Sequence, residues 1–219
     1  MPEEQLSEIL LIDKPAGITS HDVVDAIRRI YKTRRVGHAG TLDPFATGLL
    51  IVGVGKMTKK LQEYVGLDKT YIATARLGAT SDTYDLTGQL QTSGDAGPRT
   101  QDKVLEALMS FKGGYAQKAP AFSAKKVKGQ KLYEMARRGE DVEALRPVKQ
   151  VDISEIKLLD YQWPDVTFEV TCSSGTYIRS LAHDLGEKLG CGAYLTELRR
   201  TRIGEHRIED ARKLDELIP

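Results

Sequence analysis

The sequence predicts one domain that mixes strands and helices. Its 219 residues are enough to bury a sizeable core in one domain, but they are few for two full domains. Segments typical of strands and segments with helical periodicity alternate in a mixed order, without the repeating strand–helix–strand rhythm of parallel α/β folds. We therefore expect a single domain over residues 1–219.

Local patterns predict the first strand and the first helix. Residues 7–12 form a short apolar run typical of a buried strand, and the Lys-Pro-Ala-Gly sequence at 14–17 predicts a turn. Thr19 or Ser20 then supplies the N-cap of a helix. The apolar residues of this helix recur on one face, at Val23, Val24, Ile27 and Ile30.

The same periodicities predict the remaining elements. Expected strands cover residues 49–54, 70–77, 148–158, 167–172 and 194–200. Expected helices cover residues 56–64, 102–109, 131–138, 177–189 and, as a short tail, 209–217. Residues 78–99 are rich in Gly, Asp, Thr and Ser, and we expect them to form a long polar loop.

Composition excludes several classes of protein. No apolar run approaches the roughly 18 residues that a membrane helix needs, and the first residues lack the pattern of a secretory signal. We therefore expect a cytoplasmic protein. The two cysteines and four histidines show no metal-ligand spacing, so we expect no structural metal.

Positive charge is clustered although the net charge is only +1. Three basic groups stand out: Arg28, Arg29, Lys32, Arg34 and Arg35; Lys125, Lys126, Lys128 and Lys131; and Arg199, Arg200 and Arg202. Each group alone is compatible with an ordinary solvated face. The first group leads directly into a loop with a candidate catalytic acid, which favours an RNA-facing surface.

That loop, residues 37–48, holds one carboxylate and three glycines. The glycines permit tight turns and a close approach of ligand to backbone, and Pro44 restricts the conformation of Asp43. An Asp-Pro pair is also common turn chemistry, so a structural role remains open. A second polar segment places Tyr177 and Arg179 at the opening of a helix, where Arg179 could pair with Asp43.

Three stretches carry a family resemblance: GHAGTLDPFATGLL, KTYIATARLGATSDTYDLTGQL and SSGTYIRSLAHDLGEKLGCGAYLTELRRTRIG. They are similar to the bacterial tRNA pseudouridine-55 synthases of the TruB family, in collinear order over nearly the whole chain. The resemblance implies an α+β fold with a central, mostly antiparallel sheet flanked by helices and an active cleft across it. It implies isomerisation of uridine to pseudouridine at position 55 in the tRNA T arm, without a cofactor.

The resemblance also implies roles for individual residues. Asp43 would be the catalytic carboxylate, attacking C1′ or C6 or removing a sugar proton; these alternatives stay open. Arg179 would keep Asp43 ionised, with a purely structural ion pair as the alternative. Tyr71 would stack on the flipped base and could help to remove the C5 proton, although a tyrosine in a strand is commonly just packing.

Further residues would bind the substrate. The resemblance gives His38 a contact with RNA around the flipped nucleotide, with backbone capping as the alternative, and Asp85 a contact with the tRNA arm. The implied walls of the uracil pocket are Tyr177 and Leu198, and the implied phosphate contacts are Lys125 and Lys126.

The resemblance also defines expected partners. We expect binding to the tRNA T-arm stem-loop by a monomer, without a membrane or a required protein partner. Most bacterial relatives carry a small C-terminal RNA-binding domain, and the sequence ending at Leu217-Ile218-Pro219 suggests that this domain is absent or truncated. Two alternatives remain: a dyskerin-type enzyme directed by a guide RNA, and an RNA-binding module or tRNA-folding chaperone; a folding role can also accompany catalysis.

Overall fold

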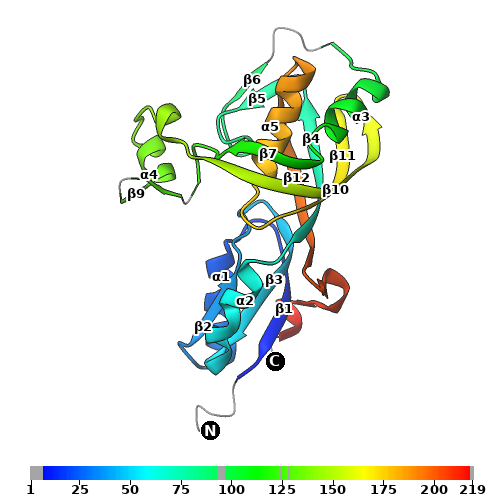
Figure 1. The fold of residues 1–219 in the computed structure, drawn as a ribbon. Helices are drawn as coiled ribbons and strands as arrows, with labels where there is room; N and C mark the ends of the chain where they lie inside the picture. Colours follow the sequence, from blue (N-terminus) through cyan, green and yellow to red (C-terminus); the bar gives the residue numbers. More distant parts are fainter. Residues whose placement is uncertain (1–6, 93–96, 124, 128, 218–219) are drawn as a thin grey trace. The chain divides into compact units, whose positions relative to one another are not determined.

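A computed structural model describes residues 7–92, 97–123, 125–127 and 129–217 (Figure 1). The described chain forms two compact units. The first comprises the residues up to Ile72 together with those from Glu197 onward, and the second comprises Ala73–Thr196. Two strands, β4 (Lys69–Leu77) and β12 (Ala193–Ile203), begin in one unit and end in the other.

Strand β3 is the central element of the first unit. It covers Thr47–Val54 and pairs antiparallel with β1 (Ile9–Lys14) and β2 (Val36–Ala39). Its beginning pairs in parallel with β12, where Thr47 and Gly48 face Arg199 and Arg200. The segment after β12 adds β13 (His206–Arg207), which pairs with β12, and β14 (Arg212–Lys213), which pairs in parallel with β1.

Both faces of β3 are buried, because successive side chains of a strand point to opposite sides. Leu50, Val52 and Val54 pack in one cluster with the apolar face of α1 (Ser20–Ile30), whereas Leu49 and Ile51 pack in another with α2 (Leu61–Val65). This two-sided burial explains why β3 is apolar along its length, whereas a half-exposed strand would alternate. A 3-10 helix, η2 (Gly55–Lys60), joins β3 to α2.

Helix α1 begins where the sequence predicts. Thr19 is the N-cap, and its hydroxyl accepts a hydrogen bond from the Asp22 amide at 3.0 Å. The Asp22 carboxylate accepts in return from the Thr19 amide at 2.7 Å. This reciprocal capping box satisfies two amides that have no partner within the helix and fixes the position of the first turn.

The second unit contains an antiparallel sheet with two helices. Strand β10 (Val148–Gln162) pairs antiparallel with β11 (Asp165–Cys172) and β7 (Gly113–Lys118). Helices α3 (Gln101–Met109) and α5 (Ile178–Leu189) belong to this unit, and α5 ends at Gly190 with a left-handed φ of 68°. The shorter elements are β5 (Ala79–Ser81), β6 (Leu90–Thr92), β8 (Lys126–Val127), β9 (Gln130–Lys131), α4 (Leu132–Arg137) and η3 (Glu143–Leu145).

The architecture is α+β with a large mixed sheet flanked by helices. Hydrogen-bonded neighbours follow the order β14-β1-β3-β12-β4-β11-β10-β7, with β2 on β3 and β13 on β12. Antiparallel pairs join β3 to β1 and β2, and β10 to β11 and β7, whereas β1 with β14 and β3 with β12 are parallel. An active cleft across the sheet stays a prediction. A single catalytic domain over residues 1–219 also stays a prediction, because two compact units are compatible with one domain or with two.

The structure confirms most expected elements and corrects two of them. The predicted tail helix over residues 209–217 is wrong: η4 (Ile208–Asp210) and η5 (Asp215–Leu217) lie on either side of β14. Pairing of β14 with β1 replaces the helical hydrogen bonds there. Residues 78–99 are not one continuous loop, because β5 and β6 pair within them as a short hairpin.

No helix among residues 7–92, 97–123, 125–127 and 129–217 is long and apolar enough to cross a membrane. Over the same ranges, His, Cys, Asp and Glu side chains form no group of three or more that could hold a metal ion.

Candidate active site

The loop that carries Asp43 joins β2 to β3 in the first unit. Gly40 and Gly48 flank it with φ of 84° and 104°, in a region that residues with a side chain rarely adopt. A Cβ on Gly48 would lie 2.3 Å from the carbonyl oxygen of Arg200. Glycine is therefore required at the exit of the loop, because β12 passes too close for any side chain.

Hydrogen bonds hold the main chain on both sides of Asp43. On one side, the Ser20 hydroxyl accepts from the Leu42 amide at 2.9 Å and donates to the Leu42 carbonyl at 3.2 Å. On the other side, the Pro44 carbonyl accepts from the Gly17 amide at 2.8 Å and from Lys14 Nζ at 3.3 Å. The motif around Lys14 and the first turn of α1 thus form a cradle for the loop.

Lys14 is fully buried. Its ammonium also donates to the carbonyls of Pro15 and Ile18 at 2.8 and 2.7 Å. Burial lowers the pKa of Lys14 to about 8, while the negative charge of Asp43 opposes that shift. Lys14 therefore links the turn after β1 to the Asp43 loop and adds positive charge near Asp43.

His38 lies on β2, opposite Val52 of β3, and is partly buried. Burial lowers the pKa of its imidazole, and the positive charges of Arg200 and His21 lower it further. The lowered pKa favours the uncharged form of His38. Among the described residues, its buried Nδ1 has no hydrogen-bond partner. This geometry leaves a contact with a bound ligand available and gives no support for backbone capping by Nδ1.

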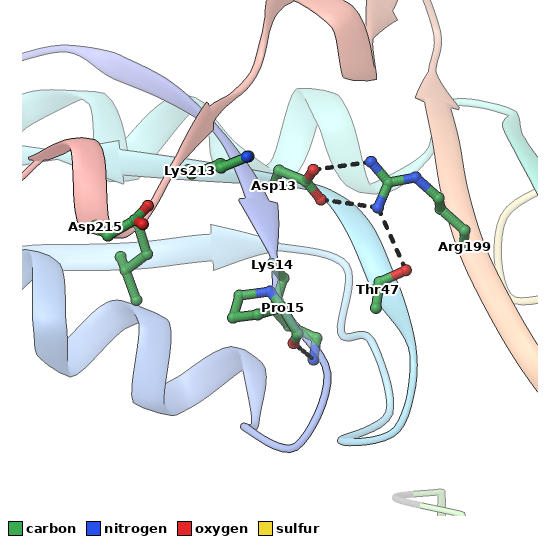
Figure 2. A pocket seen from close by; sticks show the side chains of 8 residues that line it. Asp13, Lys14, Pro15, Thr47, Arg199, Lys213 and Asp215 are labelled. Carbon is green, nitrogen blue, oxygen red and sulfur yellow. Dashed lines mark hydrogen bonds and ion pairs between the residues drawn. The ribbon is translucent and has the colours of Figure 1, made fainter.

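A pocket of about 490 Å³ lies beside the turn after β1 (Figure 2). Its lining residues are Asp13, Lys14, Pro15, Thr47, Arg199, Lys213, Leu214 and Asp215. Arg199 donates to both carboxylate oxygens of Asp13, at 2.8 and 3.1 Å, and to Thr47 at 3.4 Å. The residues predicted as catalytic or substrate-binding do not line this pocket.

In the second unit, Arg179 forms a buried ion pair with Asp85. Arg179 Nη1 lies 3.2 Å from Asp85 Oδ2, and both side chains are about 95% buried. The guanidinium also donates to the carbonyls of Thr83 and Phe122 at 2.8 and 3.1 Å. Asp85 and the two carbonyls together fix the direction of the guanidinium.

The loop around Asp85 is held by its neighbours. Asp85 Oδ1 accepts from the Thr87 amide at 2.9 Å and from the Thr83 hydroxyl at 2.7 Å. Tyr84 adopts a left-handed φ of 65° and stacks on His183 at 3.8 Å between ring centroids. Arg146 donates to the Tyr84 hydroxyl at 2.8 Å. These contacts stabilise an unfavourable backbone conformation and thereby orient the Asp85 carboxylate.

Tyr177 is the N-cap of α5, so Arg179 lies in its first turn, as the sequence predicts. The Gln117 side chain accepts from the Tyr177 amide at 2.7 Å and donates to its carbonyl at 3.0 Å. Gln117 thus satisfies the main-chain amide of the N-cap residue, which provides no side-chain cap of its own. Sequence reasoning missed this residue, because its partner lies 60 positions away.

The predicted site residues fall into two sets. Asp43, His38, Tyr71 and Leu198 belong to the first unit, whereas Asp85, Arg179, Tyr177, Lys125 and Lys126 belong to the second. The structure brings Asp85 and Arg179 together, a pair that the sequence did not predict. Pairing of Arg179 with Asp43 stays a prediction.

Burial distinguishes the remaining predicted residues. Tyr71 and Leu198 are 7% and 8% exposed, which suits pocket walls or core packing equally. Lys125 and Lys126 are exposed, as phosphate contacts require, and Lys128 of the same basic group lies outside the described residues. The third basic group does not form a fully solvated face, because Arg200 is only 1% exposed.

Comparisons with known proteins point to one family. The family model described as TruB family pseudouridylate synthase, N-terminal domain, matches residues 28–178. The model described as tRNA pseudouridylate synthase B C-terminal domain matches residues 179–218. The expected absence of a further RNA-binding domain is not tested by these matches.

Curated relatives cover nearly the whole chain. The tRNA pseudouridine synthase B of Thermotoga maritima is 47% identical over 211 residues, which are 96% of this chain and 67% of the relative. The protein of the same name from Chlamydia muridarum is 45% identical over 217 residues, which are 97% of this chain and 88% of the relative.

Solved structures share the fold. A chain of a Cbf5-Nop10-Gar1 complex matches with a TM-score of 0.76 and 32% identity, covering 98% of this chain and 55% of that one. A chain of an H/ACA RNP bound to a substrate RNA containing 2′-deoxyuridine matches with a TM-score of 0.72 and 29% identity, covering 97% and 52%. This chain spans about half the length of those solved chains. The family models and the curated relatives together show that the chain belongs to the TruB family of pseudouridylate synthases.

Proposed function

We propose that this pseudouridine synthase isomerises uridine at position 55 in the T arm of tRNA, with Asp43 as the essential carboxylate. The observation that carries the proposal is the cradle around Asp43: hydrogen bonds from the buried Ser20 and Lys14 side chains and from the Gly17 amide hold the main chain of the residue before it and of the residue after it. Such preorganisation is typical of a group that must meet a reacting atom within a narrow distance.

The reaction places definite demands on the site. The C1′–N1 bond breaks, the uracil turns over, and a C5–C1′ bond forms while C5 loses a proton and N1 gains one. The balance of atoms and electrons is that of an isomerisation, so no oxidant or reductant is consumed. Asp43 must be ionised whether it attacks C1′, attacks C6 or removes a sugar proton, and the proposal leaves this choice open.

We propose that Arg179 supplies the positive partner of Asp43 during the reaction. Asp85 and the carbonyls of Thr83 and Phe122 would then hold the guanidinium in a fixed direction. A fixed guanidinium offers its charge to a second carboxylate without reorganisation. Asp85 would consequently act through Arg179, in addition to any contact with the tRNA arm.

The other site residues would bind and orient RNA. The target uridine would be flipped out of the stack, with Tyr71 against the base and with Tyr177 and Leu198 as further walls. His38, whose uncharged form is favoured, would contact RNA near the flipped nucleotide. The exposed side chains of Lys125 and Lys126 would bind phosphates.

We also propose that the enzyme acts as a monomer in the cytoplasm, without a guide RNA or protein partner. The sequence identities favour only the guide-independent part of this proposal, because identity is 47% with a relative named tRNA pseudouridine synthase B and 32% with the chain of the Cbf5 complex. A guide-directed enzyme would need a guide RNA to bring its target. Activity on tRNA alone therefore distinguishes a guide-independent enzyme from a guide-directed one.

The test follows tritium released from C5 of uridine in an unmodified tRNA transcript, because joining C5 to the sugar expels that label. The parent protein should release tritium from position 55 alone, and Asp43→Asn should bind the tRNA and release none. Asp160→Asn is the matched control: it makes the same change at an exposed position of β10 and should behave as the parent.

Each other outcome contradicts part of the proposal. Turnover of Asp43→Asn near the parent's rate would exclude the assigned role of Asp43. Binding without release by the parent would favour a guide-directed enzyme or a tRNA-folding role, which addition of a guide RNA or a tRNA-refolding assay would then distinguish.

A further inference from the structure

We propose that Arg200 is a positioning residue that holds both ends of the Asp43 loop, so that it governs turnover and leaves tRNA affinity unchanged. The inference deepens the proposed function and rests on Asp43 being the catalytic carboxylate. In the sequence, Arg200 belongs to a basic group that is compatible with an ordinary solvated face, whereas the structure buries its side chain.

The side chain of Arg200 joins two points that lie on opposite sides of Asp43. Arg200 Nε donates to the Leu49 carbonyl at 2.7 Å, and Nη2 donates to the Gly40 carbonyl at 3.0 Å. Gly40 is the first residue after β2, and Leu49 lies near the beginning of β3, beyond the loop. Because the guanidinium is planar and its donors have fixed directions, the two bonds set the separation of the loop ends.

The backbone of Arg200 fixes the same region. Arg200 pairs with Gly48 where β12 runs parallel to β3, and the two main chains approach so closely that no Cβ fits at Gly48. The loop exit is thus held by the main chain and the side chain of one residue. A movement of β12 here would be transmitted directly to the Asp43 loop.

Burial makes these contacts obligatory. Arg200 is 1% exposed, so water cannot replace a lost acceptor. Within the described ranges, Arg200 forms no ion pair with a carboxylate, and carbonyl oxygens are its hydrogen-bond partners. The positive charge of Arg200 also contributes to lowering the pKa of Lys14 and of His38. A buried cation satisfied by loop carbonyls is costly to maintain for stability alone, and here it orders the segment that carries the acid.

Ser20 provides an independent check on loop positioning. Its hydroxyl, 1% exposed, binds both the amide and the carbonyl of Leu42, directly before Asp43. Ser20 therefore acts in the middle of the loop, whereas Arg200 acts at its ends. Ser20→Ala removes one oxygen atom and leaves the core otherwise unchanged.

The experiment measures kcat and KM for tritium release, and Kd for tRNA, with the full chain. Arg200→Lys keeps the charge, but a single ammonium cannot reproduce the paired geometry. We expect kcat to fall about 10- to 100-fold, because a displacement of about 1 Å can have that effect, while Kd stays within about twofold. Ser20→Ala should also lower kcat while leaving Kd unchanged, but by a smaller factor. Arg200→Met should lower kcat more than Arg200→Lys does.

The matched control is Arg76→Lys. Arg76 also makes two hydrogen bonds, at 2.8 Å to both carboxylate oxygens of Asp165, but it does so at an exposed site on β4. This control should keep the parent's kcat and Kd. Circular dichroism and thermal unfolding show which variants fold. If the Arg200 variants do not fold, the kcat and Kd of Ser20→Ala test whether positioning of the loop governs turnover.

The outcomes separate the two proposals. An active parent whose Arg200→Lys and Ser20→Ala variants keep their kcat would overturn the positioning role alone. A rise in Kd with unchanged kcat would overturn it too, and would make Arg200 an RNA contact. A parent that binds tRNA without releasing tritium would overturn the proposed function, and the positioning role with it.

Discussion

At the scale of single residues, burial decides how charged groups behave. Lys14, Arg200 and Arg179 are all buried, and each donates hydrogen bonds to main-chain carbonyl oxygens. Asp184 on α5 differs, because burial raises the pKa of its carboxyl to about 6 although Arg146 opposes the shift. An acid whose pKa rises on folding costs stability once it is ionised.

Asp184 predicts a measurable pH dependence. Between about pH 4 and pH 6 the folded protein holds a proton on Asp184 that the unfolded chain has lost, so the free energy of unfolding falls as pH rises through this window. Asp184→Asn removes this pH-dependent loss of stability, because an amide does not ionise. Urea unfolding at about pH 4 and pH 7.5 should therefore show the variant gaining stability over the parent at the higher pH. An equal difference in stability between variant and parent at both pH values would contradict a raised pKa for Asp184.

At the scale of elements, α1 serves both the core and the site. Its apolar face packs Val23, Val24 and Ile27 into the first unit, and its first turn presents Ser20 to the Asp43 loop. Thr19 and Asp22 fix where that turn begins. The helix start therefore matters for function as well as for folding.

Removing the cap should measure the cost of freeing this turn. Thr19→Ala loses the hydroxyl that accepts from Asp22, and we expect the free energy of unfolding to fall by about 1 kcal/mol. Thr92→Ala, at an exposed position of β6, is the matched control and should change stability much less. Equal effects in urea unfolding would indicate that the capping box contributes nothing.

At the scale of the whole molecule, the distribution of charge matters more than its sum. A net charge of +1 gives little general attraction to RNA, so affinity must come from local groups such as Lys125 and Lys126. Contacts of this kind act through release of counterions from the RNA, and their contribution weakens with salt.

The double variant Lys125→Gln/Lys126→Gln tests this contribution. The slope of log affinity against log salt should become shallower by about 1.4 to 1.8 if both residues contact phosphates, while kcat stays near the parent's value. Lys103→Gln/Lys112→Gln changes the net charge equally at exposed positions around α3 and should leave the slope unchanged. Equal slopes for both double variants would contradict a local role.

The sequence by itself determined the elements with strong local signals. The apolar spacing and N-cap of α1, the apolar run of β3 and the opening of α5 before Arg179 all follow from neighbours in the chain. The family also followed from sequence, and with it the choice of Asp43.

Tertiary structure alone decided which polar groups meet. Arg200 belongs to a basic run, yet its acceptors lie more than 150 positions away, and burial converts it from a surface charge into a support for the loop. Asp85 meets Arg179, and β14 pairs with β1 where a helix was predicted, for the same reason. Hydrogen bonds between distant segments leave no periodicity in the sequence, so only the folded chain reveals them.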